Sequence, residues 1–350
     1  MTYHRPSFRH PDLPTNELGH TRQYYEGALS TLCAGCGHDS VSAAIVQACF
    51  ELAIEPHHVA KLSGIGCSSK TPAYFLNQAH GFNSVHGRMP SVATGANAAN
   101  RQMAYIGISG DGDSASIGFG QFSHVVRRNL NMLYLVENNG CYGLTKGQDS
   151  ATADVGSAGK RGIATAFEPI DLCAQALQLG ATFVARSFSG DKQQLVPLLK
   201  AAITHKGFAF IDVISPCVTF NNTTTSTKSY DHMREHVRQA DVVDFVPAEK
   251  EITVDYAPGT TKELTLHDGS VIHLTKAQSD LDTSDPHAAL NAIHDHKVRG
   301  EVLTGLLYLD TELHDFHRVI NTMPTPLRDL QEKDLCPGGD VLQGINSGLR

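Results

Sequence analysis

The chain has 350 residues, enough to bury a substantial core, and its composition of 41% hydrophobic and 18% charged residues is that of a globular protein. Its formal net charge of −8 argues against a dedicated nucleic-acid-binding protein, because neutralising phosphates requires a basic face. No segment approaches the roughly 18 consecutive apolar residues of a membrane-spanning helix, and residues 1–10 lack the apolar centre of a signal peptide. We therefore expect a cytoplasmic protein without a nucleic-acid or membrane partner.

Residues 31–230 alternate between short apolar runs and longer helical stretches. The expected strands are Val59–Ser63, Ala104–Ser109, Met132–Val136, Thr182–Arg186 and Phe208–Ile214. The expected helices are Val41–Leu52, Pro72–Gln78, Ala93–Arg101, Ser114–Asn129, Ile170–Leu179 and Lys192–Thr204. This alternation predicts an α/β fold, a mostly parallel sheet with helices on both faces, whose ligands lie beyond the carboxyl ends of the strands.

The two ends of the chain differ from this central region. Residues 1–30 are polar and contain three prolines, which predicts an N-terminal arm. After Tyr230 the alternation stops. A hairpin is expected over Lys262–Thr275, around the favoured turn dipeptide Asp268-Gly269. We expect residues 231–350 to form a C-terminal extension that wraps on the main domain.

A glycine-containing loop, Gly110-Asp-Gly-Asp113, connects the apolar run before it to the helical stretch after it. Glycines let a backbone approach phosphate oxygens, and a helix N-terminus offers free N–H groups, although a plain turn is the ordinary alternative. The loop lacks the third glycine of a dinucleotide-binding fingerprint, and the chain contains no Walker-type sequence.

The next predicted strand ends in a second polar sequence, Glu137-Asn138-Asn139-Gly140. Asp111 and Asn139 thus follow two strands joined by one crossover helix, so their side chains can converge at the same edge of the sheet. One carboxylate, one amide oxygen and phosphate oxygens are a suitable ligand set for Mg²⁺. The sequence therefore predicts a magnesium-dependent diphosphate site.

Four of the eight cysteines are placed near this site. Cys33 and Cys36 form a Cys-x-x-Cys pair before a helix, while Cys67 and Cys217 each follow a predicted strand. Four thiolates can bind a 4Fe–4S cluster. Structural zinc and ordinary thiols stay open on this reasoning, whereas a disulfide framework is not expected in a cytoplasmic chain.

Five motifs occur in order between Thr31 and Asn221. They are Leu32-Cys-Ala-Gly-Cys-Gly-His38, Gly64-Ile-Gly-Cys-Ser-Ser-Lys70, His86-Gly-Arg88, Gly110-Asp-Gly-Asp113 and Tyr142-Gly-Leu-Thr-Lys-Gly-Gln148. Together they resemble the β subunit of 2-oxoacid:ferredoxin oxidoreductases. The resemblance implies the thiamine-diphosphate-binding fold, with thiamine diphosphate, Mg²⁺ and one 4Fe–4S cluster as cofactors.

The same resemblance implies roles for individual residues. The cluster ligands would be Cys33, Cys36, Cys67 and Cys217. The Mg²⁺ ligands would be Asp111, Asn139 and the backbone carbonyl of Cys141. The cofactor would be lined by Ile65, Gly66, Cys67, Ser68, His86, Gly87, Gly112, Asp113, Gly143 and Leu144. Lys70 is the catalytic candidate, since it would hold an anionic substrate or coenzyme A.

The reaction implied by the resemblance is oxidative decarboxylation of a 2-oxo acid with coenzyme A, with electrons passing to ferredoxin. An α subunit would supply the cofactor-activating glutamate, so a hetero-oligomer is implied. The loop ending at Lys70, the turn at His86 and the C-terminal extension look most like members that convert 2-oxoglutarate to succinyl-CoA and CO₂. The alternatives are a pyruvate-type member, a thiamine-dependent non-redox decarboxylase with structural zinc, and an electron-transfer subunit without a catalytic centre.

Overall fold

The computed structural model describes residues 13–157, 162, 164–223, 225–240, 281–336 and 338–349, and the backbone of 261–265 and 271–275. Its helices are α1 (Gly37–Glu51), α2 (Met89–Ala99), α3 (Phe119–Arg127), α4 (Leu172–Gln178), α5 (Lys192–Thr204), α6 (Tyr230–His236), α7 (Pro286–Val298), α8 (Phe316–Val319), α9 (Glu332–Leu335) and α10 (Gly339–Gly348). Its strands are β1 (Val59–Ser63), β2 (His80–Asn83), β3 (Ala104–Gly110), β4 (Met132–Asn138), β5 (Cys141–Tyr142), β6 (Gln148–Asp149), β7 (Phe183–Phe188), β8 (Phe208–Ile214), β9 (Val237–Gln239), β10 (Thr261–Thr265), β11 (Val271–Thr275) and β12 (Val302–Leu309).

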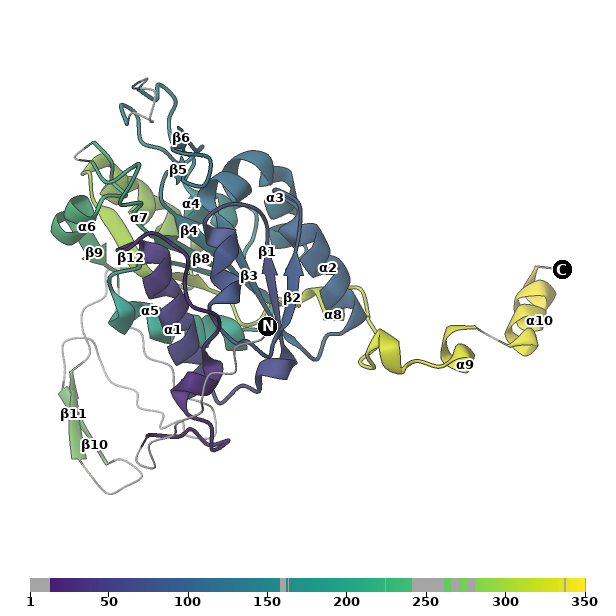
Figure 1. The fold of residues 1–350 in the computed structure, drawn as a ribbon. Coiled ribbons are helices and arrows are strands. Elements are labelled where there is room, and N and C mark those ends of the chain that lie inside the picture. The colour runs from purple at the N-terminus through teal and green to yellow at the C-terminus, as the bar shows by residue number, and fades with distance from the viewer. Residues whose placement is uncertain are drawn as a thin grey trace, which may run out of the picture.

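An eight-stranded sheet in the order β2-β1-β3-β4-β8-β7-β12-β9 forms the centre of the fold (Figure 1). The six strands from β2 to β7 along this order are all parallel. Strand β12 pairs antiparallel with β7, and β9 pairs parallel with β12. The predicted α/β fold with a mostly parallel sheet is confirmed.

Helices cover both faces of the sheet, and each face has its own apolar core. On one face, α1 and α5 contribute buried residues such as Ile45 and Leu198, which join Leu133 and Leu135 of β4. On the other face, α2, α3, α4 and α7 pack around strand residues such as Tyr134. Because successive side chains of a strand point to opposite faces, the continuous apolar run of β4 serves both cores.

The helix predicted over Pro72–Gln78 is wrong. Its first two residues instead end a 3-10 turn over Ser68–Ala73, and the residues after this turn are irregular. The buried ammonium of Lys61 explains the difference, because it donates to the carbonyl oxygens of Pro72, Phe75 and Leu76 at 2.7–2.9 Å. The ammonium competes with helical N–H groups for these carbonyls, although Leu76 still accepts the Ala79 N–H at 2.9 Å, and proline supplies no N–H of its own.

The helix predicted over Ser114–Asn129 divides into a π-helical turn over Gly112–Ile117 and α3, with Gly118 between them. The other predicted strands and helices are present, with bounds shifted by a few residues. The predicted hairpin after Tyr230 is confirmed by the antiparallel pair β10–β11, although its Asp268-Gly269 turn lies outside the described residues.

Part of the expected C-terminal extension lies in the central sheet. Strand β12 inserts beside β7, and α7 buries Ala289 and Ile293 in one of the two cores. Beyond α8 the chain extends away from the body, and α9 and α10 lie apart from the sheet (Figure 1). None of the described helices has the length and apolar character needed to cross a membrane.

Candidate functional site

A cavity of about 90 Å³ opens at the carboxyl ends of β1, β3 and β4. Twelve of the residues predicted to form the site line it, namely Ile65, Gly66, Cys67, Ser68, His86, Asp111, Gly112, Asp113, Asn139, Cys141, Gly143 and Leu144. The wall also contains residues that the sequence reasoning did not select: His38, Gly110, Glu137, Tyr142 and Thr145. The topology of a parallel sheet thus brings loops from distant parts of the chain to one place.

Glycines bring the backbone of these loops unusually close to neighbouring side chains. A Cβ atom on Gly112 would lie 2.5 Å from the Tyr142 ring, whose hydroxyl donates to the Gly112 carbonyl oxygen at 3.0 Å. A Cβ atom on Gly110 would lie 2.8 Å from Ser68 Oγ. A side chain at either position would clash with these neighbours, so both positions require glycine. A loop of this kind leaves its backbone N–H groups able to approach phosphate oxygens closely.

Asp113 fixes the loop that carries His86. Its Oδ1 accepts the Gly87 N–H at 2.7 Å and makes a short contact with His86 Nδ1, while its Oδ2 accepts the Ser109 hydroxyl at 2.9 Å. The Asp113 carboxylate is 3% exposed. These bonds give Asp113 a clear structural role, because they hold the His86-Gly87 turn against the cavity.

Asp111 and Asn139 are neighbours, as their positions in the sequence predict. The Asn139 N–H lies 3.4 Å from Asp111 Oδ1, and Asn139 Oδ1 accepts the Cys141 N–H at 3.1 Å. Burial raises the pKa of Asp111, whereas hydrogen bonds from Ser150, Thr152 and the Asn139 N–H oppose that rise. A divalent cation would favour the charged carboxylate further, so the oxygen donors here fit Mg²⁺.

A second buried carboxyl group, Glu137, lies between the loops and the cysteines. It is 0% exposed, and burial raises its pKa well above the usual value. His38 lies nearby, with Nδ1 2.6 Å from Ser215 Oγ and 3.7 Å from Glu137 Oε2. Burial lowers the pKa of His38 to about 4, so its imidazole is neutral at pH 7. A charged residue inside an apolar strand was the sequence signal that could have identified Glu137.

Two of the four predicted cluster cysteines, Cys67 and Cys217, lie beside Gly143 at the edge of the cavity. A Cβ atom on Gly143 would lie 3.4 Å from Cys67 Sγ and 3.8 Å from Cys217 Sγ. Cys36 interacts electrostatically with Cys217, and Cys33 with Cys67. The Thr219 hydroxyl, two residues after Cys217, donates to Cys33 Sγ at 3.9 Å. All four are free thiols.

Cys217 has the electrostatic character of a metal ligand. A hydrogen bond from the Cys141 thiol and three backbone N–H groups lower its pKa to about 6, against the opposing effect of burial. These hydrogen bonds favour the thiolate, which is the ligand form of cysteine. Burial raises the pKa of Cys36 to about 12, which means that this residue needs a bound cation to lose its proton.

Within the described ranges, no group of three or more histidine, cysteine, aspartate or glutamate side chains is arranged around a single ion. Both predicted metal centres therefore stay predictions. The proposed Mg²⁺ set contains only one such side chain, together with an amide, a carbonyl and phosphate oxygens. In a 4Fe–4S cluster each cysteine binds a different iron, so the four sulfurs need not meet at one point.

Lys70 stands apart from the cavity wall. It lies half-buried in the 3-10 turn that follows Cys67, and its backbone N–H donates to the Cys67 carbonyl at 3.1 Å. Its charge lowers the pKa of Cys67, against the larger raising effect of burial. Lys70 is thus close to the cysteines, while its predicted contact with substrate stays a prediction.

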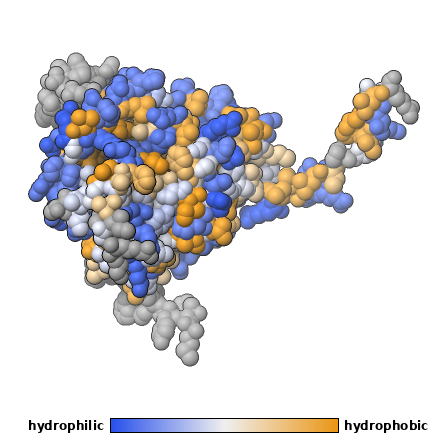
Figure 2. Space-filling view, turned by 90° about the horizontal axis from the view of Figure 1, so that it is seen from above, coloured by the Kyte–Doolittle hydropathy of each residue, from blue (hydrophilic) through white to orange (hydrophobic). Residues whose placement is uncertain are grey.

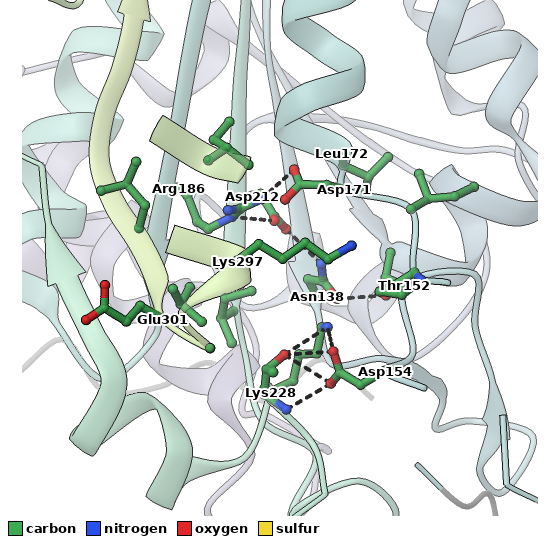
Figure 3. Close-up of a pocket in the computed structure, with 18 of the residues that line it drawn as sticks. Asn138, Thr152, Asp154, Asp171, Leu172, Arg186, Asp212, Lys228, Lys297 and Glu301 are labelled. Carbon is green, nitrogen blue, oxygen red and sulfur yellow. Dashed lines mark hydrogen bonds and ion pairs between the residues drawn. The ribbon is translucent and has the colours of Figure 1, made fainter. Parts of the chain in front are cut away.

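A second cavity of about 280 Å³ lies on the other side of Asn138 and Thr152 (Figure 3). Arg186 pairs there with Asp171 at 2.6 Å and with Asp212 at 3.1 Å. The coulombic effect of the two carboxylates raises the pKa of Arg186, against the lowering effect of burial. This group thus contains one guanidinium and two carboxyl groups, so the cavity wall here is polar and holds one more acid than base.

Comparisons with known proteins agree with this geometry. The family described as "Thiamine pyrophosphate enzyme, C-terminal TPP binding domain" matches residues 64–213. The β subunit of a 2-oxoacid:ferredoxin oxidoreductase from Saccharolobus solfataricus is 43% identical over 202 residues, which are 57% of this chain and 65% of that protein. The chain thus covers just under two thirds of that relative's length.

Two further proteins match over a larger share of their length. The β subunit of 2-oxoacid:ferredoxin oxidoreductase 2 from Aeropyrum pernix is 36% identical over 233 residues, covering 66% of this chain and 74% of the relative. A solved 2-oxoglutarate:ferredoxin oxidoreductase from Magnetococcus marinus superposes with a TM-score of 0.69 at 30% identity, over 86% of this chain and 88% of the other. The chain therefore belongs to the family of 2-oxoacid:ferredoxin oxidoreductase β subunits.

Proposed function

We propose that this chain is the β subunit of a thiamine-diphosphate-dependent, CoA-acylating 2-oxoacid:ferredoxin oxidoreductase, and that its substrate is 2-oxoglutarate. The observation that carries the proposal is the position of Cys67. This residue lines the cavity and also lies beside Cys217, so one loop joins the diphosphate site to the predicted cluster ligands. An oxidoreductase needs the two centres close together, whereas a non-redox decarboxylase does not.

Bound thiamine diphosphate would supply the nucleophile and electron sink for decarboxylation. The chain's own residues would hold it. Asp111, Asn139 and the Cys141 carbonyl would bind Mg²⁺, and the Gly112 loop would contact the diphosphate. His86 is held against the same cavity by Asp113. The thiolates of Cys33, Cys36, Cys67 and Cys217 would hold a 4Fe–4S cluster, which carries single electrons.

The size of the cavity supports a partner subunit. At about 90 Å³ it is far smaller than the roughly 300–1,000 Å³ of a pocket that encloses a drug-sized ligand. Only part of the cofactor would therefore be held by this chain, and an α subunit would cover the rest. Exposed apolar residues near the site, including Ile65 and Leu144, are consistent with such an interface.

The C-terminal segment offers a second apolar surface. Val341, Leu342, Ile345 and Leu349 are 50–81% exposed, and Figure 2 shows hydrophobic residues along the segment that projects from the body. Their spacing places them on one side of a helix. Apolar surface of this kind is usually covered in an assembly, which supports a hetero-oligomer.

The choice of 2-oxoglutarate rests on two considerations. The Magnetococcus marinus enzyme was solved with 2-oxoglutarate, coenzyme A and succinyl-CoA bound. In addition, a doubly charged acid needs a cation for its distal carboxylate, and Lys70 is a half-buried lysine in the turn that follows Cys67. A pyruvate-type specificity is the alternative outcome of the test.

The test is purification of the chain with its α subunit, followed by analysis of iron, sulfide, zinc and thiamine diphosphate. About four iron and four sulfide per chain, with CoA-dependent reduction of ferredoxin by 2-oxoglutarate, is the expected result. Zinc in place of iron, or decarboxylation without ferredoxin reduction, would favour the non-redox alternative and overturn the proposal.

A further inference from the structure

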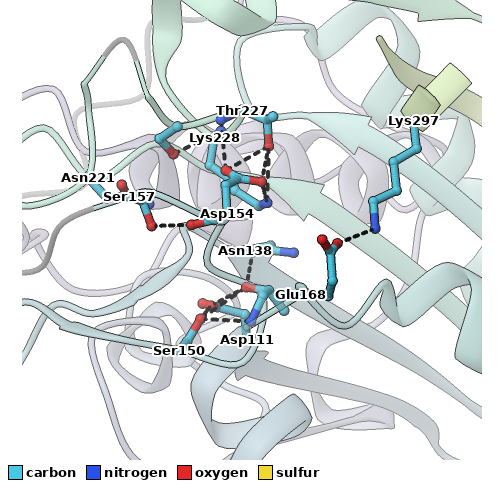
Figure 4. Close-up of polar contacts among 12 residues, drawn as sticks. Asp111, Asn138, Ser150, Asp154, Ser157, Glu168, Asn221, Thr227, Lys228 and Lys297 are labelled. Atoms are coloured by element: carbon cyan, nitrogen blue, oxygen red, sulfur yellow. Dashed lines mark hydrogen bonds and ion pairs between the residues drawn. The ribbon is translucent and has the colours of Figure 1, made fainter. Parts of the chain in front are cut away.

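Two buried hydroxyl groups converge on one oxygen of Asp111. Thr152 Oγ1 lies 2.7 Å from Asp111 Oδ2, and Ser150 Oγ makes a short hydrogen bond to the same atom. Figure 4 shows Ser150 directed at Asp111. The other oxygen, Oδ1, faces the Asn139 N–H at the longer distance of 3.4 Å. The two carboxylate oxygens are therefore in different environments.

The segment that carries the hydroxyls is fixed to the other half of the predicted metal site. The Ser150 N–H donates to the Gly140 carbonyl at 3.2 Å, and the Ala153 N–H donates to the Ser150 carbonyl at 3.1 Å. Gly140 directly follows Asn139, the second predicted Mg²⁺ ligand. The turn over residues 150–153 therefore ties the Asp111 carboxylate to the Asn139 loop.

The Thr152 hydroxyl has one hydrogen and three possible acceptors: Asp111 Oδ2, Asn138 Oδ1 and Ser150 Oγ, the last 3.0 Å away. Asn138 Oδ1 is 3.0 Å away, and its orientation is set by the bond from Asn138 Nδ2 to Asp212 Oδ1, also at 3.0 Å (Figure 3). Asp111 Oδ2 is the nearest of the three at 2.7 Å, so it is the favoured acceptor. The contact with Asn138 Oδ1 restricts rotation of the Thr152 side chain.

We propose that Ser150 and Thr152 are positioning residues for the divalent cation. By donating both hydroxyl hydrogens to Oδ2 of Asp111, they hold the carboxylate so that Oδ1 faces the cation. This inference deepens the proposed function, since it requires a cation at Asp111. Partners that orient a metal ligand in this way typically change metal affinity about 10- to 100-fold when removed.

The test uses the purified complex with its α subunit and thiamine diphosphate, with Mn²⁺ as the probe. Free Mn²⁺ is measured by electron paramagnetic resonance during titration of the wild type, Thr152→Val, Thr152→Ser and Ser150→Ala. We expect Thr152→Val and Ser150→Ala each to weaken Mn²⁺ binding about 10- to 100-fold, and Thr152→Ser to restore it. With excess Mn²⁺, kcat should return towards the wild-type value, which damage to the fold would not allow.

Thr182→Val is the matched control. Thr182 is equally buried, and its hydroxyl also bonds to side chains, those of Asn129 and His205, but at the N-terminal end of β7. Its Mn²⁺ affinity should equal that of the wild type. Wild-type affinity in both Thr152→Val and Ser150→Ala overturns this inference alone. If Thr152→Val does not fold, Ser150→Ala decides. A wild-type complex that binds no Mn²⁺ instead contradicts the cation site in the proposed function.

Discussion

Thr71 Oγ1 lies 3.0 and 2.9 Å from the two carboxylate oxygens of Glu137, which lines the cavity at the carboxyl ends of the strands. Both residues are fully buried. A lone hydroxyl cannot replace the hydration that a carboxylate loses there, so the neutral acid is favoured in the folded chain. Glu137 thus contributes a neutral side chain to an apolar strand that ends at a strongly polar site.

The first prediction concerns Glu137→Gln. The pKa of Glu137 is higher in the folded chain than in the unfolded chain, where it is near 4.5. The stability that this difference contributes is fully present below pH 4.5 and is lost as the pH rises through the folded-state pKa. Glutamine has nearly the same shape and cannot ionise. The variant should therefore gain stability relative to the wild type as pH rises from 4.5 to 8, measured by thermal unfolding of the purified complex.

Glu51→Gln is the control for this prediction. Lys200 and Gln47 hold the pKa of Glu51 below its usual value, against the opposing effect of burial, so its contribution is present at neutral pH and lost as pH falls. Its variant should lose relative stability as pH rises. Parallel curves for the two variants would contradict the assignment of Glu137 as a neutral buried acid.

The second prediction concerns Asp111→Ala. Removal of the carboxylate takes away the only charged protein ligand proposed for Mg²⁺ and the acceptor that the Thr152 and Ser150 hydroxyls share, while Thr152 keeps Asn138 Oδ1. Each unsatisfied buried hydroxyl costs about 1–3 kcal/mol. We expect Mg²⁺-dependent thiamine diphosphate binding to be lost in calorimetry, while iron content stays near the wild-type level. Unchanged cofactor affinity would show that the cation is bound elsewhere.

The third prediction concerns Cys217→Ser, with Cys141→Ala as its matched control. The two thiols are hydrogen-bonded neighbours, but only Cys217 has its pKa lowered to about 6. Loss of Cys217 should remove most of the iron–sulfur absorbance near 400 nm and abolish ferredoxin reduction. Cys141→Ala keeps the backbone carbonyl and should keep the cluster. A complete cluster in Cys217→Ser would identify that residue as an ordinary buried thiol.

The sheet and the site loops were predictable because they depend on local sequence. Strands β1 and β8 match the expected ranges residue for residue, since each is an apolar run that ends at polar or glycine residues. The site loops follow from the rule that parallel strands place their carboxyl ends at one edge. Twelve predicted residues accordingly meet in one cavity.

Features that depend on distant contacts were not predictable. The Lys61 ammonium binds three carbonyl oxygens of the segment that was expected to be helical, and the sequence around Pro72 does not show this. Strand β12 joins β7 across more than a hundred intervening residues, with a bulge between Leu306 and Tyr308. Thr152 also escaped notice, because its importance comes from burial beside the site and not from a motif.

The last prediction is the substrate, tested through Lys70. A distal carboxylate of 2-oxoglutarate paired with this ammonium would gain a charge-assisted hydrogen bond of about 1.5–3 kcal/mol, whereas pyruvate has no group to use it. Lys70→Met should therefore lower kcat/KM for 2-oxoglutarate by roughly 10- to 100-fold and change the value for pyruvate little.

Two variants serve as controls for this prediction. Lys70→Arg should retain much of the activity. Arg88→Met removes an exposed cation near the same site and controls for a general loss of positive charge. Equal losses for both acids in Lys70→Met would mean that Lys70 contacts coenzyme A or the cofactor, because those are common to the two reactions. A wild-type preference for pyruvate would overturn the substrate assignment and leave the cofactor chemistry intact, since the cavity and the cysteines do not depend on which acid enters.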